Sequence, residues 1–161
     1  MWLLLITPDA DPLIGAWRAE HDSAARYGIP AHVTVRTPFL PPEQWADPEL
    51  SQLERFLPMP VTLARLEDRL GALVIVAEPD DDLREITDAT TRLWPTLLPH
   101  KASFRPFAYH ATVVRTEDAR VRSNAAEAIA PHLPLRVTGT EMWAAVEDSA
   151  TKEVRHAVVA T

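Results

Sequence analysis

The sequence contains no cysteine among its 161 residues. It therefore has neither a disulfide framework nor a thiolate metal site, and a reducing cytoplasm is the expected compartment. Long apolar runs are also lacking. The apolar opening Met1-Trp2-Leu3-Leu4-Leu5-Ile6 runs directly into Thr7-Pro8-Asp9. That run is too short for a signal peptide or a membrane span, so we expect a buried first strand and no association with a membrane.

Basic residues are few. Sixteen Lys and Arg stand against 23 Asp and Glu, which gives a formal charge of −7. Proteins that hold long nucleic acids use a basic surface, so this charge argues against that class, while a small anionic ligand or a nucleic-acid end stays compatible. Glycine is scarce too, with 4 Gly against 15 Pro, which favours stiff loops. With 47% hydrophobic residues, the chain can bury a core, and we expect a monomer.

The pattern of predicted elements contains an internal repeat. The order is helix, a strand with a His-x-Thr tripeptide, helix, strand, strand, and the same five elements then recur. The predicted ranges are 11–28, 31–37, 48–57, 61–66 and 72–77 for the first copy, and about 80–97, 109–115, 121–131, 135–146 and 154–160 for the second. We predict an α+β fold of one domain over 1–161, in which two αβαββ lobes are related by a pseudo-two-fold axis and equivalent strands face each other.

The two tripeptides carry the chemistry. Residues i and i+2 of a strand project from one face, so His32 lies beside Thr34, and His110 beside Thr112. If the two strands face each other, two imidazoles and two hydroxyls converge on a space of phosphate size. One imidazole can then take a proton, the other can give one, and the hydroxyls can bind the phosphate oxygens. Taken alone, each histidine is better explained as a hydrogen-bonded structural residue.

Two segments resemble a known family. Pro30-Ala31-His32-Val33-Thr34-Val35 and Tyr109-His110-Ala111-Thr112-Val113-Val114-Arg115 are similar to the motifs of the two-histidine (2H) phosphoesterases, in particular the bacterial branch of 2′-5′ RNA ligases and 2′,3′-cyclic phosphodiesterases. The resemblance in element order covers nearly the whole chain. It implies a bilobal α+β fold with antiparallel sheets around a central groove.

For this chain the resemblance makes His32 and His110 the acid/base pair and Thr34 and Thr112 the phosphate ligands, with no metal and no cofactor. The expected activity is hydrolysis, or reversible transesterification, of 2′,3′-cyclic phosphates or 2′-5′ phosphodiesters on nucleotides or RNA ends. Two alternatives stay open. One is a cyclic phosphodiesterase of small metabolites, and the other is a nucleotide- or RNA-binding relative without turnover.

Further candidate substrate contacts flank the motifs. They are Arg36, Phe39, Lys101, Arg105, Phe107, Tyr109 and Arg115. Strand alternation puts Arg36 on the face of His32, where it suits a phosphate, although an exposed strand arginine is an equal account. Arg115 matches the family pattern, yet strict alternation turns it away from the groove unless the strand ends there.

The remaining candidates lie in or next to loops. The aromatic residues Phe39, Phe107 and Tyr109 can stack on a nucleobase or pack in the core. Lys101 and Arg105 form a local basic cluster that can hold an outer phosphate. The other four histidines share no spacing typical of a zinc site, so no metal ligand is predicted.

Overall fold

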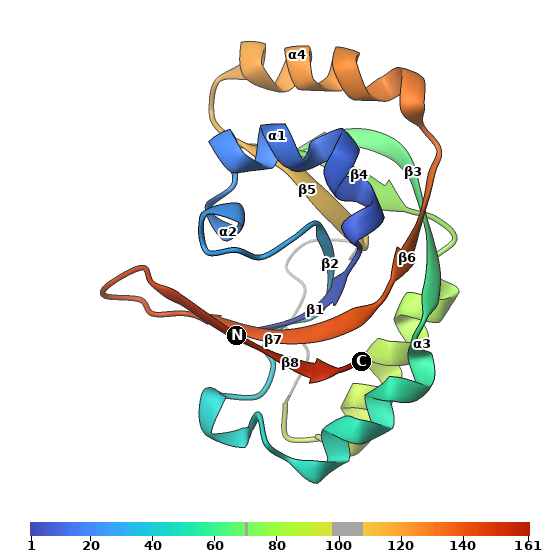
Figure 1. Cartoon of the computed structure of the whole chain (residues 1–161), viewed down its shortest axis with the longest axis vertical. Helices are drawn as coiled ribbons and strands as arrows, with labels where there is room; N and C mark the ends of the chain where they lie inside the picture. The colour runs from blue at the N-terminus through green and yellow to red at the C-terminus, as the bar shows by residue number, and fades with distance from the viewer. Residues whose placement is uncertain (70, 98–107) are drawn as a thin grey trace.

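The computed structural model describes residues 1–69, 71–97 and 108–161 (Figure 1). Within these residues an antiparallel sheet of 8 strands has the order β6-β3-β4-β5-β2-β1-β7-β8. The strands are β1 (Trp2–Ile6), β2 (His32–Arg36), β3 (Met59–Arg69), β4 (Ala72–Ala77), β5 (His110–Arg115), β6 (Leu135–Gly139), β7 (Glu141–Glu147) and β8 (Val154–Ala160). The predicted α+β class with antiparallel pairing is confirmed, and the strands form one continuous sheet.

Helices follow the predicted order with two differences. The helices are α1 (Asp11–His21), α2 (Ser23–Arg26), α3 (Asp81–Leu93) and α4 (Ala119–Ile129), with 3-10 segments η1 (Pro8–Ala10), η2 (Pro42–Gln44), η3 (Pro48–Phe56) and η4 (Ala130–His132). The helix expected at 48–57 is a 3-10 segment. The helix expected over 11–28 breaks at Asp22, where the backbone is extended. The Asp22 carboxylate caps α2 by accepting a hydrogen bond from the Ala24 amide at 3.2 Å.

The main core lies between one face of the sheet and the helices. Alternate residues of the strands pack there against residues of the helices. Examples that are all 0% exposed are Leu5, Val33, Ile75 and Ala111 from strands and Ile14, Ile86 and Ile129 from helices. Burying each of these valine, leucine or isoleucine side chains contributes about 1.5–3 kcal/mol. The strand residues in between project from the other side of the sheet, which we call the open face. Two small apolar clusters lie on it, one around Leu4 and Ile6 and one around Val74 and Val76.

The two His-x-Thr strands are neighbours at the centre of the sheet. β2 pairs with β5 through Val33 and Ala111. On one side of this pair follow β1, β7 and β8, and on the other β4, β3 and β6. Segments from the two ends of the chain therefore build one half of the sheet, as the blue and red strands in Figure 1 show.

A β-bulge follows the tripeptide of β2. Its neighbour β1 pairs consecutive residues, Leu4 and Leu3, with Thr34 and Arg36, so Val35 is an extra residue. A bulge shifts the alternation by one position. Val35 and Arg36 therefore both point into the core side of the sheet, where Arg36 is 2% exposed.

The strand β5 has a bulge at the same place. Thr112 and Val114 pair with consecutive residues of β4, so Val113 is the extra residue here. Both valines are 0% exposed and belong to the main core. The offset returns Arg115 to the open face, on the side of Thr112.

Candidate active site

The pairing of β2 with β5 gathers the four motif side chains on the open face. With Val33 opposite Ala111 in an antiparallel pair, His32 lies opposite Thr112 and Thr34 opposite His110. His32 and His110 are then diagonal neighbours on the two strands, and residues so placed lie about 7–8 Å apart. Two imidazoles and two hydroxyls thus alternate around the Val33–Ala111 pair at the centre of the sheet.

Both imidazoles are held by the same backbone contact. The Nδ1 atom of His32 lies 2.8 Å from the Pro30 carbonyl oxygen, and that of His110 lies 2.8 Å from the Ala108 carbonyl oxygen. A carbonyl only accepts, so each Nδ1 carries the proton and donates it. The Nε2 atom of each ring is then the free lone pair at neutral pH, and it can accept a proton from a bound molecule or return one.

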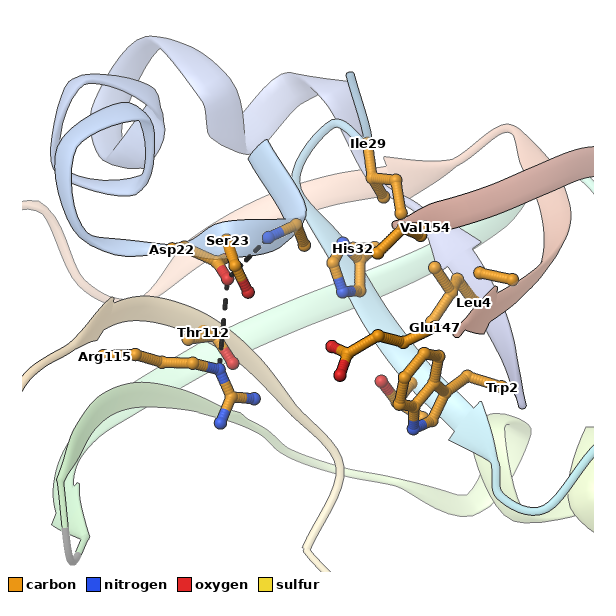
Figure 2. A pocket seen from close by; sticks show the side chains of 13 residues that line it. Trp2, Leu4, Asp22, Ser23, Ile29, His32, Thr112, Arg115, Glu147 and Val154 are labelled. Carbon is orange, nitrogen blue, oxygen red and sulfur yellow. Dashed lines mark hydrogen bonds and ion pairs between the residues drawn. The ribbon is translucent and has the colours of Figure 1, made fainter. Parts of the chain in front are cut away.

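A cavity of about 380 Å³ lies on the open face over β2. Thr34, His32, Thr112 and Arg115 line one end of it, and Figure 2 shows His32, Thr112 and Arg115 facing the space. Its size is in the range of small-molecule sites, about 300–1,000 Å³. No described residue forms a hydrogen bond with the hydroxyl of Thr34 or Thr112, so both hydroxyls are available to a ligand.

Arg115 is the cation of this cavity, and its neighbour Asp22 is nearly buried. The Arg115 Nε atom lies 3.9 Å from the Asp22 Oδ1 atom (Figure 2). Asp22 is 2% exposed and also forms a 3.1 Å ion pair with Arg18, which is itself 2% exposed. Arg18 further donates to the Ile29 carbonyl at 3.0 Å. Buried charges need such partners, and this pair fixes the carboxylate beside Arg115.

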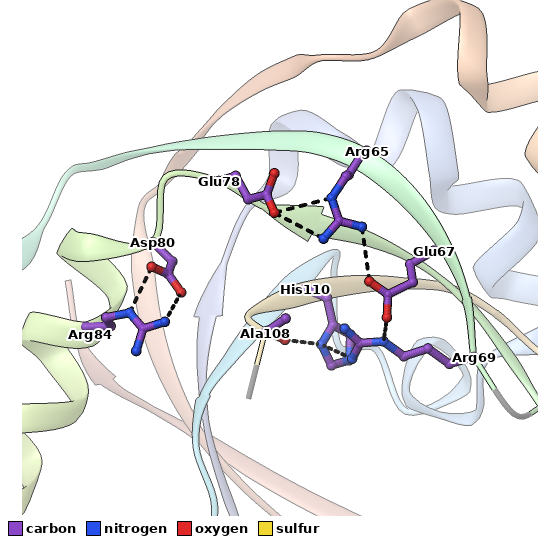
Figure 3. A network of polar contacts seen from close by, with 8 residues as sticks. All are labelled: Arg65, Glu67, Arg69, Glu78, Asp80, Arg84, Ala108 and His110. Atoms are coloured by element: carbon purple, nitrogen blue, oxygen red, sulfur yellow. Dashed lines mark hydrogen bonds and ion pairs between the residues drawn. The ribbon is translucent and has the colours of Figure 1, made fainter. Parts of the chain in front are cut away.

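On the other side of β5, a charged network approaches His110 (Figure 3). The Arg69 Nη1 atom lies 3.1 Å from the His110 Nδ1 atom, and Glu67 holds Arg69 through a 2.8 Å contact with its Nε atom. Because His110 Nδ1 donates to Ala108, the Arg69 guanidinium acts on the ring as a nearby positive charge. Arg65 continues the network to Glu67 at 3.1 Å.

Burial and these charges lower the pKa of both rings. Burial is the main cause for His32, and with Arg18 and Arg115 it outweighs the Pro30 carbonyl and Asp22, so its pKa falls from 6.5 to about 4. Burial also leads for His110, where Arg69 and Arg115 add to it, and its pKa lies below the usual value. In the free protein both rings are therefore neutral at neutral pH.

Two predicted substrate contacts are wrong. Arg36 does not face the groove, because the bulge at Val35 turns it toward α3. There it donates to the Thr91 hydroxyl at 2.6 Å, and it also donates to the carbonyl of Leu97, which follows the helix. Phe39 does not reach the surface either: it is 0% exposed and packs edge-on against Trp94, with ring centres 5.6 Å apart.

The other flanking candidates are placed as follows. Tyr109 packs rather than stacks, because it is 3% exposed and its hydroxyl shares a 2.6 Å hydrogen bond with Thr87. Arg115 faces the cavity, and the bulge supplies the reason that alternation alone could not. Lys101, Arg105 and Phe107 lie outside the described residues.

Several residues of the site carried no sequence motif. Asp22 and Arg18 come from the α1–α2 junction, Trp2 from β1, which pairs with β2, Glu147 from β7 on the far side of β1, and Arg69 from β3. The sequence signal that could have been used is Asp22 itself, because it is an N-cap residue type in the middle of the stretch predicted as one helix. The others depend on strand pairing over long sequence distances.

Among the described residues, no group of three or more His, Asp or Glu side chains is placed to hold a metal ion. In the same part of the chain, no helix is both long and apolar enough to cross a membrane.

Comparison with known proteins identifies the family of this chain. The family model of the 2′-5′ RNA ligase superfamily matches residues 6–151, which is most of the sequence. The chain belongs to the 2′-5′ RNA ligase superfamily. This places it among the 2H phosphoesterases, as the two tripeptides predicted.

Solved structures of E. coli LigT have a fold similar to that of this chain. The LigT complex with NADP+ has a TM-score of 0.53 at 18% identity, over 98% of this chain and 92% of that one. The LigT complex with 3′-AMP has a TM-score of 0.54 at 16% identity, with the same coverage of 98% and 92%. At this identity the likeness supports the fold alone. No curated protein matches the sequence significantly.

Proposed function

We propose that this protein is a metal-independent phosphoesterase that cleaves, or reversibly transesterifies, a 2′,3′-cyclic phosphate or a 2′-5′ phosphodiester on a nucleotide or RNA end. The observation that carries the proposal is the β2–β5 register, which sets His32 opposite Thr112 and Thr34 opposite His110. Family membership supports phosphoesterase chemistry, and the LigT complexes with NADP+ and 3′-AMP support a nucleotide ligand.

The chemistry follows from the two free Nε2 atoms. In hydrolysis of a cyclic phosphate, one neutral imidazole takes a proton from the attacking water as its oxygen bonds to phosphorus. The other, as imidazolium, gives a proton to the ribose oxygen as its bond to phosphorus breaks. Thr34, Thr112 and Arg115 donate to the non-bridging oxygens, where negative charge is concentrated. Joining a cyclic phosphate to a 5′-hydroxyl uses the same pair with an alcohol in place of water.

A substrate panel tests this proposal. The panel contains 2′,3′-cyclic nucleotides, short RNAs with cyclic ends, 2′-5′ dinucleotides and ADP-ribose cyclic phosphate, and phosphorus NMR follows each conversion. We expect the cyclic-phosphate signal of a nucleotide or RNA end to be replaced by that of a monoester. Conversion of the ADP-ribose compound alone would favour the alternative of a small-metabolite enzyme. Binding of all compounds without conversion would favour the relative without turnover.

Chelation tests the metal independence of the reaction. The proposed acid, base and oxyanion donors are all side chains, so we expect turnover of the best panel substrate to be unchanged in EDTA. Rates are compared before chelation, after it, and after readdition of Mg²⁺, Mn²⁺ or Zn²⁺. Loss of turnover in EDTA, with recovery on addition of a divalent ion, would show that the proposed mechanism is wrong.

The lowered pKa values of both histidines make a prediction for the pH dependence. The productive state carries one proton on the pair, and in the free enzyme that state forms only on the acid side of 6.5, the ordinary histidine value. We expect kcat/KM to pass through a maximum there and to fall as the pH rises through neutrality. A bound phosphate anion favours the imidazolium, so the kcat profile should lie at higher pH. A kcat/KM maximum on the alkaline side of neutrality would contradict these shifts.

A further inference from the structure

The cavity extends well beyond the space that one phosphate fills, and it does so in one direction. Leu4 pairs with Thr34, and Trp2 lies two positions further along β1 on the same face, about 7 Å away at the usual rise of a strand. Trp2 pairs with Ala145 of β7, and Glu147 follows two positions beyond Ala145. The cavity is therefore lined first by a hydroxyl, then by an indole, then by a carboxylate.

The indole and the carboxylate lie next to each other. Figure 2 shows the Glu147 carboxylate beside the Trp2 ring, with both directed into the cavity that His32 borders. Trp2 is partly buried on an apolar floor that includes Leu4 and Ala145. An aromatic ring on such a floor offers one π-face to a flat ligand.

The two halves of the open face differ in character. Beside β2 the cavity has apolar lining residues, namely Trp2, Leu4, Ile29, Ala145 and Val154, next to the polar groups of His32, Thr34 and Glu147. Beside β5 the corresponding strand β3 presents the charged network of Arg65, Glu67 and Arg69 instead. A flat apolar group of a ligand therefore fits the half built on β1 and β7.

The walls of this half are fixed by contacts outside the cavity. The Tyr27 hydroxyl, from the end of α2, donates to the Lys152 carbonyl in the β7–β8 turn at 2.8 Å. The His156 Nε2 atom lies 3.2 Å from the Tyr27 carbonyl oxygen, and its ring stacks on Trp143 at 4.7 Å between centres. A site held in place before binding spends less binding energy on ordering its walls.

We propose that this half of the cavity is a nucleobase subsite that selects guanine. The base stacks on Trp2 while its sugar lies toward Thr34, and the Glu147 carboxylate accepts the N1–H and N2–H donors of its Watson–Crick edge. This proposal rests on the proposed function, and it names the substrate class as guanosine nucleotides.

The choice of guanine follows from the hydrogen-bonding groups of Glu147. A carboxylate offers two acceptor oxygens, and guanine presents two adjacent donors that match them in bidentate fashion. Uracil presents a single N–H donor between two carbonyl oxygens that a carboxylate repels, and adenine and cytosine present an amino donor beside an acceptor. Lys152 lies 3.4 Å from the Glu147 Oε1 atom, but it is 69% exposed, so this pair is weak and yields to a ligand.

Calorimetric binding of guanosine and uridine 3′-monophosphates tests the subsite without turnover. We expect the unchanged protein to bind the guanosine compound about 10–100-fold more tightly, the usual effect of hydrogen bonds to a charged group. Glu147→Gln should remove most of this preference, because it weakens guanosine binding and ends the repulsion of the uracil carbonyl oxygens. Trp2→Ala should weaken the binding of both nucleotides about tenfold. Trp2→Phe should weaken their binding less, because a phenyl ring still stacks on the base.

The matched control is Glu153→Gln, which removes an exposed carboxylate of the same β7–β8 region that does not line the cavity. It should keep the guanosine preference. Equal binding of both nucleotides by the unchanged protein, or a preference that survives Glu147→Gln, would overturn the subsite. Turnover of cyclic phosphates without base preference would remove the subsite and leave the proposed function intact. Base preference without any turnover would do the reverse.

Discussion

His32→Ala and His110→Ala should each lower kcat on the best panel substrate by about 10²–10⁴-fold, the usual contribution of a general acid or base. Both rings have Nδ1 bound to a carbonyl, which leaves Nε2 for proton transfer, so each variant removes one proton-transfer group. The double variant should be hardly slower than either single one, because a relay that lacks one member has already lost most of its benefit.

The threonines and a distant histidine provide the comparison for these variants. Thr34→Ala and Thr112→Ala should each cost less than a histidine variant, since a neutral hydroxyl adds one hydrogen bond to a charge that other donors share. His132→Ala, in the exposed segment η4, should leave kcat unchanged. Steady-state rates and thermal unfolding are measured for each variant. Near-normal turnover in either single histidine variant, with the fold intact, would rule out the two-histidine mechanism.

Two arginines that follow the tripeptides should have opposite phenotypes. Arg36→Met should lower the free energy of unfolding on the order of 3 kcal/mol, because it leaves carbonyl and hydroxyl acceptors of α3 without their buried donor. Arg115→Met should leave stability nearly unchanged, since Arg115 is exposed, and should lower kcat/KM about 10–100-fold by removing a charged phosphate donor.

Denaturant unfolding and steady-state kinetics separate these two effects. Arg120→Met, which changes an exposed arginine at the start of α4, is the control for both and should behave like the unchanged protein. If Arg36→Met lost activity while keeping its stability, the assignment of Arg36 to the core would fail. If Arg115→Met were unstable but fully active when folded, Arg115 would have no part in binding phosphate.

The sequence sufficed for the features that depend on local pattern. The strand character of 31–37 and 109–115 follows from β-branched composition, and the placement of His32 with Thr34 and of His110 with Thr112 on one face follows from strand alternation. The family resemblance carried by the same residues was also correct. The strand predicted over 135–146 is instead two strands, β6 and β7, which lie in different parts of the sheet.

The sequence did not reveal the two bulges. An extra residue, Val35 or Val113, has the same valine character as its neighbours, so nothing in composition marks it. Yet it decides the face of each following arginine, which made the prediction for Arg36 wrong and left that for Arg115 open. The contribution of Trp2 and Glu147 was equally hidden, because β1 and β7 lie at opposite ends of the chain and meet only through sheet pairing.

Nitrogen NMR of the histidine rings, with and without inorganic phosphate, tests most directly whether His32 and His110 flank one phosphate. Before phosphate is added, at neutral pH, both rings should be neutral with the proton on Nδ1, as their 2.8 Å carbonyl contacts require. Saturating phosphate should shift both Nε2 resonances and raise the pKa of at least one ring, while the other four histidines stay unchanged. Protons on Nε2 in the free protein, or a response from only one of the two rings, would contradict the account.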